Sequence, residues 1–396
     1  MRKPSDLPRL LYVGDAPVEA SYHGSALLYR LLQTYPKDRL RIIESGMELS
    51  LPERRLSQVT YFPALQPFRR WFNTRLNRWL YILLSLRATV FTRGVSKAVG
   101  DFQPEAVLTV AHGFSWLTAA TYARRRRLPL HFIVHDDWPR IVGHWPLISG
   151  WVDRQFALCY REAVSRLCVS PFMVEDYERR YSTRGTVLYP GRAADCPVFD
   201  GFPPRLSQHR EQLVGAYAGS INSGSYAESV KSLAHSLARV GGKLLLFGPH
   251  TLETLAVGQL KLPNVFAGGL LPSNELINRL RSEADFLFVP MSSEGAGSDA
   301  SLRTSFPSKL TDYTAAGLPM LICGPEYCSA VRWARQNEPV AEVITSVNAA
   351  GLQSALERLM KPEHRAILAT RALQVGSMQF SHAIAERVFH AALLRS

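Results

Sequence analysis

The sequence lacks several features that would identify its chemistry directly. Its 396 residues include only 5 cysteines, and none has a Cys-x-x-Cys or Cys/His spacing typical of a zinc site. This odd, scattered set favours reduced thiols and a cytoplasmic setting. No stretch approaches the roughly 18 apolar residues of a transmembrane helix, and the N-terminus lacks the apolar core of a signal peptide. We therefore expect neither a membrane span nor a leader.

Three common site fingerprints are also missing. The chain has no GxxxxGK[ST] loop, no GxGxxG after its first predicted strand and no GxSxG elbow. A P-loop ATPase is therefore disfavoured. Asp136 and Asp137 are adjacent and form a possible carboxylate pair, but no further acidic cluster accompanies them. We expect no metal site and no cofactor.

Positive charge is concentrated in the first half of the chain. Residues 1–195 contain 28 Lys and Arg against 17 Asp and Glu, a net charge of +11, whereas residues 196–396 contain 18 against 16, a net charge of +2. A basic domain indicates an anionic partner such as a membrane surface, a polyanionic substrate or nucleic acid. Nothing resembles a nucleic-acid-binding fold, so we expect no nucleic acid.

Short apolar runs alternate with helical patterns along the whole chain, which predicts an α/β fold. The expected arrangement is two Rossmann-like domains that face each other across a cleft, with the last helix folding back onto the first domain. The predicted parts are an N-terminal domain at 1–195, a Gly- and Pro-rich linker at 196–210, a C-terminal domain at 211–378 and a returning helix at 379–396.

The segment 306–324, FPSKLTDYTAAGLPMLICG, is the most informative stretch. It predicts a loop, a short helix that ends at Gly317, and a buried strand. Lys309 and Asp312 lie three residues apart on that helix and so share a face. A helix N-terminus with a lysine attracts phosphate, and a carboxylate one turn later can bind sugar hydroxyls. An ordinary αβ unit with a surface ion pair remains the alternative.

Polar residues and glycines follow the predicted strands, at the sheet edge where ligands bind. His135 follows an apolar run, and the alternative for this region is a surface loop in which Asp137 caps a helix. The Ser- and Gly-rich loop 292–309 could wrap a diphosphate with its N–H groups or could simply link a strand to a helix. The strand ends supply the following candidates: Gly14, His112, His135 and Asp136 in the first domain, and Gly219, Ser220 and Gly248 in the second.

Arginines and aromatic residues are interleaved between Gln66 and Lys97. This pattern is typical of a basic amphipathic helix at an anionic bilayer surface. A domain helix whose arginines extend around a core face would give the same pattern. Four consecutive arginines at 124–127 could extend the basic patch or lie at a solvated helix end.

On these residues, the chain resembles GT-B glycosyltransferases, and most of all glycosyltransferase family 4. Asp312 precedes Gly317 as the second Glu of the family's Glu-x7-Glu motif does, and Pro307-Ser308-Lys309 resembles the Pro-x-Lys of some members. The resemblance implies that Asp312 binds the donor's ribose and that Lys309 contacts its diphosphate.

The chain departs from the family pattern at Thr304, where the first Glu of that motif would stand, and Glu294 is the candidate substitute. Basic residues that the family places after the first strand of domain two are missing, so Lys309 and Arg303 are the expected replacements. By the same resemblance His135 lies near the transferred sugar, Gly24 near the reacting centre, and 265–268 beside the nucleobase.

The expected function is transfer of a sugar from a nucleotide sugar to a cell-envelope, exopolysaccharide or lipid-linked acceptor, with retention of configuration, in the cytoplasm or at the inner membrane face. The alternative is a GT-B protein that binds or epimerises nucleotide sugars without transfer. The expected catalytic residues are His135, Lys309 and Glu294. The expected donor-binding residues are Gly219, Ser220, Gly248, Gly268, Arg303, Ser305, Phe306, Pro307, Ser308 and Asp312, and the expected acceptor-side residues are Gly14, His23, Gly24, His112 and Asp136.

Overall fold

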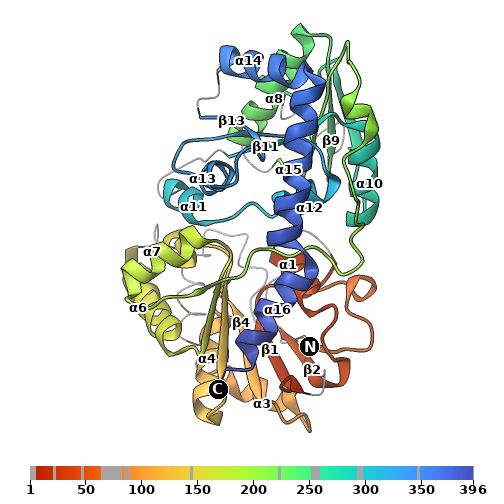
Figure 1. The fold of residues 1–396 in the computed structure, drawn as a ribbon. Coiled ribbons are helices and arrows are strands. Elements are labelled where there is room, and N and C mark those ends of the chain that lie inside the picture. The colour runs from red at the N-terminus through yellow and green to blue at the C-terminus, as the bar shows by residue number, and fades with distance from the viewer. Residues whose placement is uncertain are drawn as a thin grey trace. The chain divides into compact units, whose positions relative to one another are not determined.

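The computed structural model describes residues 6–20, 24–45, 49–63, 83, 87, 90–142, 146–221, 224–250, 259–291, 298–345 and 348–395. The chain divides into two compact units, one of Met1–Ala194 with His382–Ser396 and one of Asp195–Ser381. Each unit is built on its own parallel sheet covered by helices (Figure 1). This is the α/β class that the sequence predicts.

The first unit contains a parallel sheet of seven strands in the order β3-β2-β1-β4-β5-β6-β7. Strands β1, β4 and β5 are buried along their whole length, because their apolar runs are covered on both faces. The strands are β1 Leu10–Gly14, β2 Leu40–Glu44, β3 Thr60–Pro63, β4 Ala106–Val110, β5 Leu130–Val134, β6 Ser165–Cys168 and β7 Thr186–Val187. The α-helices are α1 Gly24–Leu32, α3 Thr92–Val99, α4 Ser115–Arg126, α5 Trp138–Ile141, α6 Pro146–Glu162, α7 Pro171–Tyr181 and α16 His382–Leu393.

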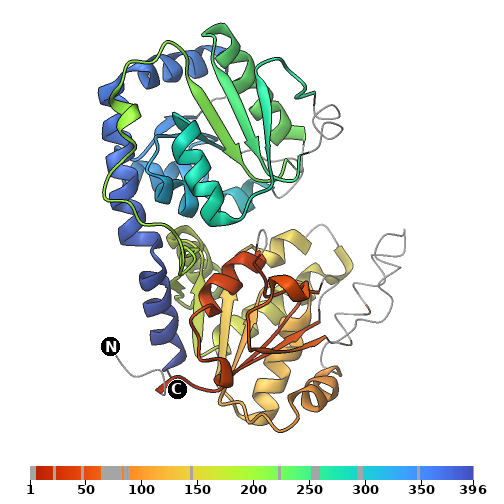
Figure 2. The same cartoon turned by 90° about the vertical axis from the view of Figure 1, so that its right-hand side faces the viewer.

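The second unit contains a parallel sheet of six strands in the corresponding order β10-β9-β8-β11-β12-β13. Figure 2 shows the fold from a second side, with helices packed around each sheet. Its strands are β8 Val214–Ala218, β9 Lys243–Phe247, β10 Val265–Gly269, β11 Phe286–Pro290, β12 Met320–Cys323 and β13 Glu342–Ile344. Its α-helices are α8 Gly224–Arg239, α10 Ser273–Glu283, α11 Ser298–Thr304, α12 Lys309–Ala316, α13 Ser329–Gln336, α14 Ala349–Met360 and α15 Pro362–Phe380.

The last helix, α16, packs on the first unit as the sequence analysis expects. Phe389 is fully buried in the core of that unit, with its ring 6.4 Å from that of Tyr35. At the rim of this contact the Thr34 hydroxyl donates a hydrogen bond of 2.6 Å to Glu386. The chain therefore completes its first unit with residues from its far end.

The residue pattern of Cys159–Leu167 predicts a helix, and this prediction is wrong in its second half, because α6 ends at Glu162. Ser165–Cys168 forms strand β6, which pairs with β5 so that Ser165 lies opposite His131. Strand pairing outweighs the local helical pattern here. The edge strands β3 and β13 do not correspond to any predicted strand, because Thr60–Pro63 and Glu342–Ile344 are too short to form a clear apolar run.

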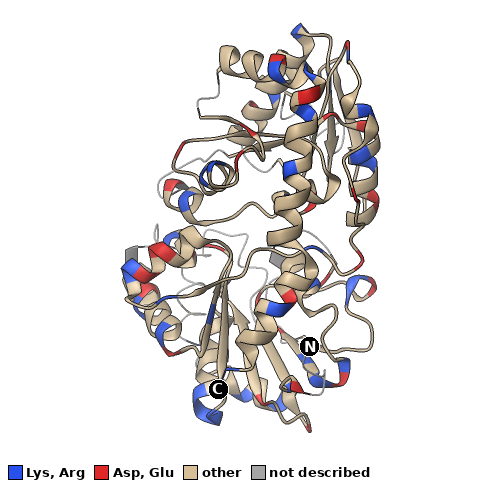
Figure 3. Ribbon diagram, in the orientation of Figure 1, with Lys and Arg blue, Asp and Glu red and all other residues tan. Residues whose placement is uncertain are grey.

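The Arg- and aromatic-rich region 66–97 lies largely outside the described residues, which include only 83, 87 and 90–97 of it. The arginine run does belong to a helix, because Arg124, Arg125 and Arg126 form the last turn of α4 (Figure 3). Arg125 donates a hydrogen bond of 2.5 Å to Thr92 of α3. Within the described part of the chain, no helix is both long and apolar enough to cross a membrane.

A buried carboxylate secures the start of the second unit. Asp285 is 1% exposed and accepts bonds from Arg205 Nη1 at 2.6 Å and from the Val214 backbone N–H at 2.9 Å. We expect Asp285→Asn to lower the free energy of unfolding by about 3 kcal/mol, because it leaves a partly buried guanidinium without its counter-charge. Urea unfolding measures this change. The control Glu283→Gln, which removes the surface pair with Arg279, should stay close to wild type, and equal effects of the two variants would contradict this account.

Candidate functional site

In both sheets the strand order reverses beside the first strand of the unit. In the first unit β1 lies between β2 and β4, and in the second β8 lies between β9 and β11. Doubly wound sheets bind ligands beyond the carboxyl ends of their strands at such a point. The residues that follow β1, β4 and β5, and those that follow β8 and β9, are therefore the candidates for function.

In the second unit, Lys309 at the start of α12 lies against the end of β8. A Cβ atom at Gly219 would lie 2.7 Å from the lysine Nζ, so only glycine permits this approach. Gly219 also has a φ of 140°, which side chains disfavour. Nζ lies 5.0 Å from the ring centre of Tyr217. Among the described residues it forms no hydrogen bond or ion pair.

This setting makes the Lys309 ammonium a cation that lacks a counter-charge. Burial lowers the pKa of Lys309 from its ordinary 10.5 to about 8. The first N–H groups of a helix are also left without partners inside the helix, and they attract anions. An anionic group placed here would gain from the ammonium, from the N–H groups and from the helix dipole together.

His250 holds the peptide at Gly219 from the other side. Its Nε2 lies 2.8 Å from the Gly219 carbonyl oxygen and donates a hydrogen bond to it. A Cβ at Gly248, where φ is 146°, would lie 2.6 Å from the same oxygen. Burial lowers the pKa of His250. The sequence analysis includes Gly219 and Gly248 but misses His250, although its place just after β9 offers the same strand-end signal.

Helix α12 is fixed to β8 by the residue that follows Asp312. The Tyr313 hydroxyl is buried and accepts a hydrogen bond of 2.7 Å from the backbone N–H of Ala218. Asp312 itself is half-buried, one turn after Lys309. The pair that the sequence predicts on one face of this helix is therefore present, on an element that is tied to the strand end.

Residues Ser305 and Phe306, just before α12, are held by packing and by a backbone hydrogen bond. Phe306 is 7% exposed, and its ring lies 6.0 Å from that of Trp333 and 5.7 Å from that of Phe380. The carbonyl of Ser305 accepts a hydrogen bond from the Ser329 hydroxyl. The Phe306 ring is engaged in packing with these two aromatic residues, and the expected role of Phe306 in donor binding stays a prediction.

Pro307 and Ser308 lie at the entry to the helix. Their carbonyl groups accept hydrogen bonds from the backbone N–H groups of Leu310 and Thr311, both at 3.1 Å. Ser308 is exposed and its hydroxyl does not cap the helix. Its side chain is therefore not engaged in holding α12 together.

Two residues near Lys309 in the sequence, Arg303 and Thr304, have contacts of their own. Arg303 is exposed and stacks over Tyr327 at 4.2 Å from the ring centre. Thr304, at the position of the family's first Glu, is 2% exposed and donates a hydrogen bond of 3.1 Å to Ala300 within its own helix. Glu294 lies outside the described residues. Lys309 is thus the cation that the structure places at the strand end.

Two further predicted donor residues occupy tight backbone positions. The carbonyl of Ser220 accepts a hydrogen bond of 2.7 Å from the Tyr217 hydroxyl. A Cβ at Gly268 would lie 2.4 Å from the ring of Phe247, at an irregularity in the edge strand β10. Both positions favour a fixed backbone over a mobile loop.

In the first unit, the residues after β1 hold the fold together. Asp15 accepts hydrogen bonds from the Ser115 backbone N–H at 2.8 Å and from its hydroxyl at 2.6 Å. It therefore caps α4. The Gly14 carbonyl accepts a hydrogen bond of 3.0 Å from the backbone N–H of Ser45. Gly24 is the first residue of α1, and His23 lies outside the described residues.

The structure brings His112, His135 and Asp136 together from the ends of β4 and β5. The two imidazole rings are 5.6 Å apart at an interplanar angle of 22°. His135 Nε2 lies 3.1 Å from Asp136 Oδ2. The ring of Trp138, a residue that the sequence analysis does not include, lies 5.2 Å from that of His112. Two of the predicted acceptor-side residues, His112 and Asp136, thus lie together with His135, which the sequence analysis expects to be catalytic.

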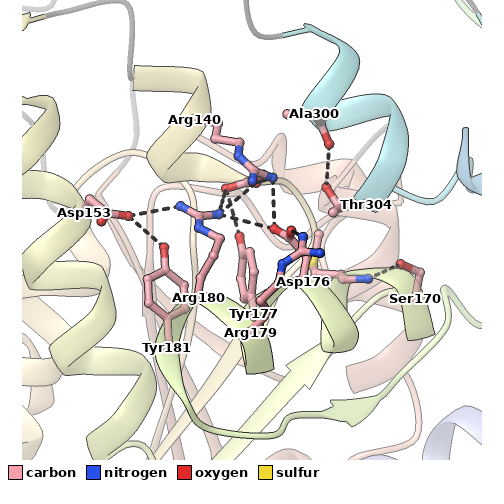
Figure 4. Close-up of polar contacts among 12 residues, drawn as sticks. Arg140, Asp153, Ser170, Asp176, Tyr177, Arg179, Arg180, Tyr181, Ala300 and Thr304 are labelled. Atoms are coloured by element: carbon pink, nitrogen blue, oxygen red, sulfur yellow. Dashed lines mark hydrogen bonds and ion pairs between the residues drawn. The ribbon is translucent and has the colours of Figure 1, made fainter. Parts of the chain in front are cut away.

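A network of buried charges supports the loop that carries this cluster (Figure 4). Asp137 is fully buried and accepts bonds from Arg140 at 2.8 Å, from Arg180 at 3.1 Å and from the Tyr177 hydroxyl at 3.2 Å. Asp176 also bonds Arg140, at 2.9 Å. Asp137 therefore serves the structure, and the alternative that it is one of a pair of metal-binding carboxylates with Asp136 is not favoured.

Comparison with known proteins assigns the fold. No protein-family model matches the chain, and no curated protein matches it. HepE from Anabaena, solved with UDP and glucose, is similar over 98% of this chain and 99% of its own, with a TM-score of 0.67 and 13% identity. The lipopolysaccharide outer core galactosyltransferase WaaB covers 97% of this chain and 98% of its own, with a TM-score of 0.61 and 16% identity.

A third solved structure, WaaG, a glycosyltransferase involved in lipopolysaccharide biosynthesis, has a TM-score of 0.62 and 16% identity over 98% of this chain and 99% of its own. These similarities cover nearly the whole chain in each case. The chain has the GT-B fold that its sequence resembles.

The partner-free lysine gives a pH dependence of stability. Because the pKa of Lys309 is lowered in the folded state, the unfolded chain binds its proton more tightly, and folding gains stability as pH rises from about 8 to 10.5. We expect Lys309→Met to be more stable than wild type at pH 7, by a margin that shrinks toward pH 10. Urea unfolding at the two pH values tests this. The exposed Lys261→Met serves as the control, and a margin that does not change with pH would contradict the account.

Proposed function

We propose that the protein transfers a sugar from a nucleoside-diphosphate sugar to a glycan or lipid-linked acceptor. The observation that carries this proposal is the Lys309 ammonium, which is half-buried without a counter-charge at a helix N-terminus. It lies against Gly219, whose lack of a side chain permits this close approach. Such a group suits a diphosphate, whose two negative charges need a cation and N–H donors. The GT-B fold supports the same class of donor.

Each residue would act on a different part of the donor. Lys309 and the N–H groups at the start of α12 would stabilise the charge that develops on the diphosphate as it leaves. Asp312 would accept hydrogen bonds from the ribose hydroxyls, and His135 would position the transferred sugar. Departure of the diphosphate would need no metal ion, because the cation and the helix end supply the positive charge. By family resemblance the transfer would retain configuration.

The acceptor side is proposed from charge and from the structural neighbours. WaaB and WaaG are named for lipopolysaccharide, and HepE was solved with UDP and glucose. The net charge of +11 on residues 1–195 would suit an acceptor that carries phosphate or a lipid diphosphate. Peripheral contact of the 66–97 region with an anionic membrane at its cytoplasmic face belongs to the same proposal.

The first test of the donor site is calorimetric binding of a panel of nucleoside diphosphates to wild type and to Lys309→Ala. We expect wild type to bind at least one of them and the variant to bind it about 10- to 100-fold more weakly, because a charge-assisted contact is lost. Arg303→Ala is the matched control, since Arg303 stacks on Tyr327, and it should bind nearly as wild type does.

Two results would contradict this proposal. One is the absence of binding across the panel together with no slow hydrolysis of any nucleotide sugar. The other is unchanged affinity in Lys309→Ala, which would remove that residue from its proposed role.

A second test separates the ribose contact from the diphosphate contact. If Asp312 binds ribose hydroxyls, Asp312→Asn should weaken a nucleoside diphosphate about 10-fold and leave pyrophosphate binding unchanged. Wild type should bind the 2′-deoxynucleoside diphosphate more weakly than the ribonucleotide by a similar factor. The variant should bind the two nucleotides with equal affinity. An equal loss for pyrophosphate would show that Asp312 acts on the phosphates or on the fold.

A second function is favoured by one observation, the threonine at the position of the family's first Glu. Threonine has no carboxylate to offer to the donor, and the Thr304 side chain is buried and hydrogen-bonded within its own helix. A protein that binds nucleotide sugars, or epimerises them, without transfer would tolerate this change. Tight nucleotide binding with neither hydrolysis nor transfer would favour the binding protein, and donor epimerisation without an acceptor would favour the epimerase.

A further inference from the structure

The cluster at the ends of β4 and β5 has the composition of a metal site. His112, His135 and Asp136 each offer one ligand atom, and these atoms all lie within 4.8 Å of one another. It is the one group of three such ligands that the described residues contain. Two imidazoles and a carboxylate suit a divalent ion of the zinc, iron, cobalt or nickel type better than Ca²⁺ or Mg²⁺, which prefer oxygen ligands.

The relation of the two rings supports shared ligation. Imidazoles that bind one tetrahedral ion at about 2.0–2.1 Å have ring centres roughly 5 Å apart. The rings of His112 and His135 are 5.6 Å apart, and their planes differ by 22°. An ion shared by the two rings would lie in the plane of each, so both side chains would rotate to bind it. Asp136 is already at the same place, 3.1 Å from His135 Nε2.

The surroundings also suit an ion that exchanges a ligand. The His135 side chain is 12% exposed and that of Asp136 is 41% exposed, so the cluster is partly desolvated yet reachable from solvent. Three protein ligands leave at least one position open.

We propose that His112, His135 and Asp136 together bind one divalent transition metal ion of the zinc type. The ion would keep an open position for water or for an oxygen atom of the acceptor. This inference revises the expectation from sequence that the protein has no metal site. It does not rest on the proposed contacts with the nucleotide, which Lys309, Asp312 and the start of α12 would make in the other unit; His135 is the residue that both proposals use.

The test uses untagged, full-length protein that has been treated with a chelator. Co²⁺ titration followed by visible absorption, and Zn²⁺ titration by calorimetry, should each show one site per chain. We expect His112→Ala and His135→Ala each to weaken binding by at least about 100-fold, because removal of a ligand exceeds the loss caused by removing a supporting residue.

The matched control is His364→Ala. His364 also lies against a carboxylate, that of Glu342, but Arg358 already pairs with this carboxylate at 2.7 Å. The control should bind metal as wild type does. Circular dichroism shows whether each variant is folded. If an alanine variant is not folded, the glutamine variant at the same position replaces it. Absence of the cobalt spectrum in wild type, or equal affinity in the folded histidine variants and the control, would overturn the proposal.

Because this titration uses no nucleotide, its outcome is separable from that of the proposed function. Metal binding without nucleotide binding would leave the site standing and remove the donor proposal. Nucleotide binding without metal binding would do the reverse.

Discussion

The approach of Lys309 to Gly219 is the contact on which the account of the second unit depends. The strand order places β8 at the centre of its sheet, and the Tyr313 hydroxyl fixes α12 to the end of that strand. With a side chain at Gly219 the lysine could not lie there. The result is a cation held by packing at the N-terminal end of a helix, without a carboxylate to neutralise it. A fold keeps such an arrangement at a cost, which an anionic ligand can offset.

The first unit uses its charged residues in two different ways. Asp15 and Asp137 are buried, and both are fully engaged, one in capping α4 and the other with two arginines and a tyrosine. They hold the strand ends in place. His112, His135 and Asp136 lie one step further out, where solvent reaches them. The buried acids therefore hold in place the strand ends that carry this cluster.

The sequence predicts the two α/β units and the helix with Lys309 and Asp312, because apolar runs and glycine stops are local signals. It does not predict that Phe306 is a core residue or that Arg303 stacks on Tyr327, since both contacts are made with residues that lie later in the chain. The sequence also does not predict that His112 and His135 lie together. Only the pairing of β4 with β5 brings those two strand ends together.

The central claim is that the end of β8 and the start of α12 bind the diphosphate of a nucleotide. The most direct measurement is a crystal structure with a nucleoside diphosphate bound. The account predicts phosphate oxygens within hydrogen-bond distance of Lys309 Nζ and of the N–H groups at the start of α12, with the ribose hydroxyls at Asp312. A nucleotide bound elsewhere in the second unit, with Lys309 still lacking an anionic partner, would contradict it.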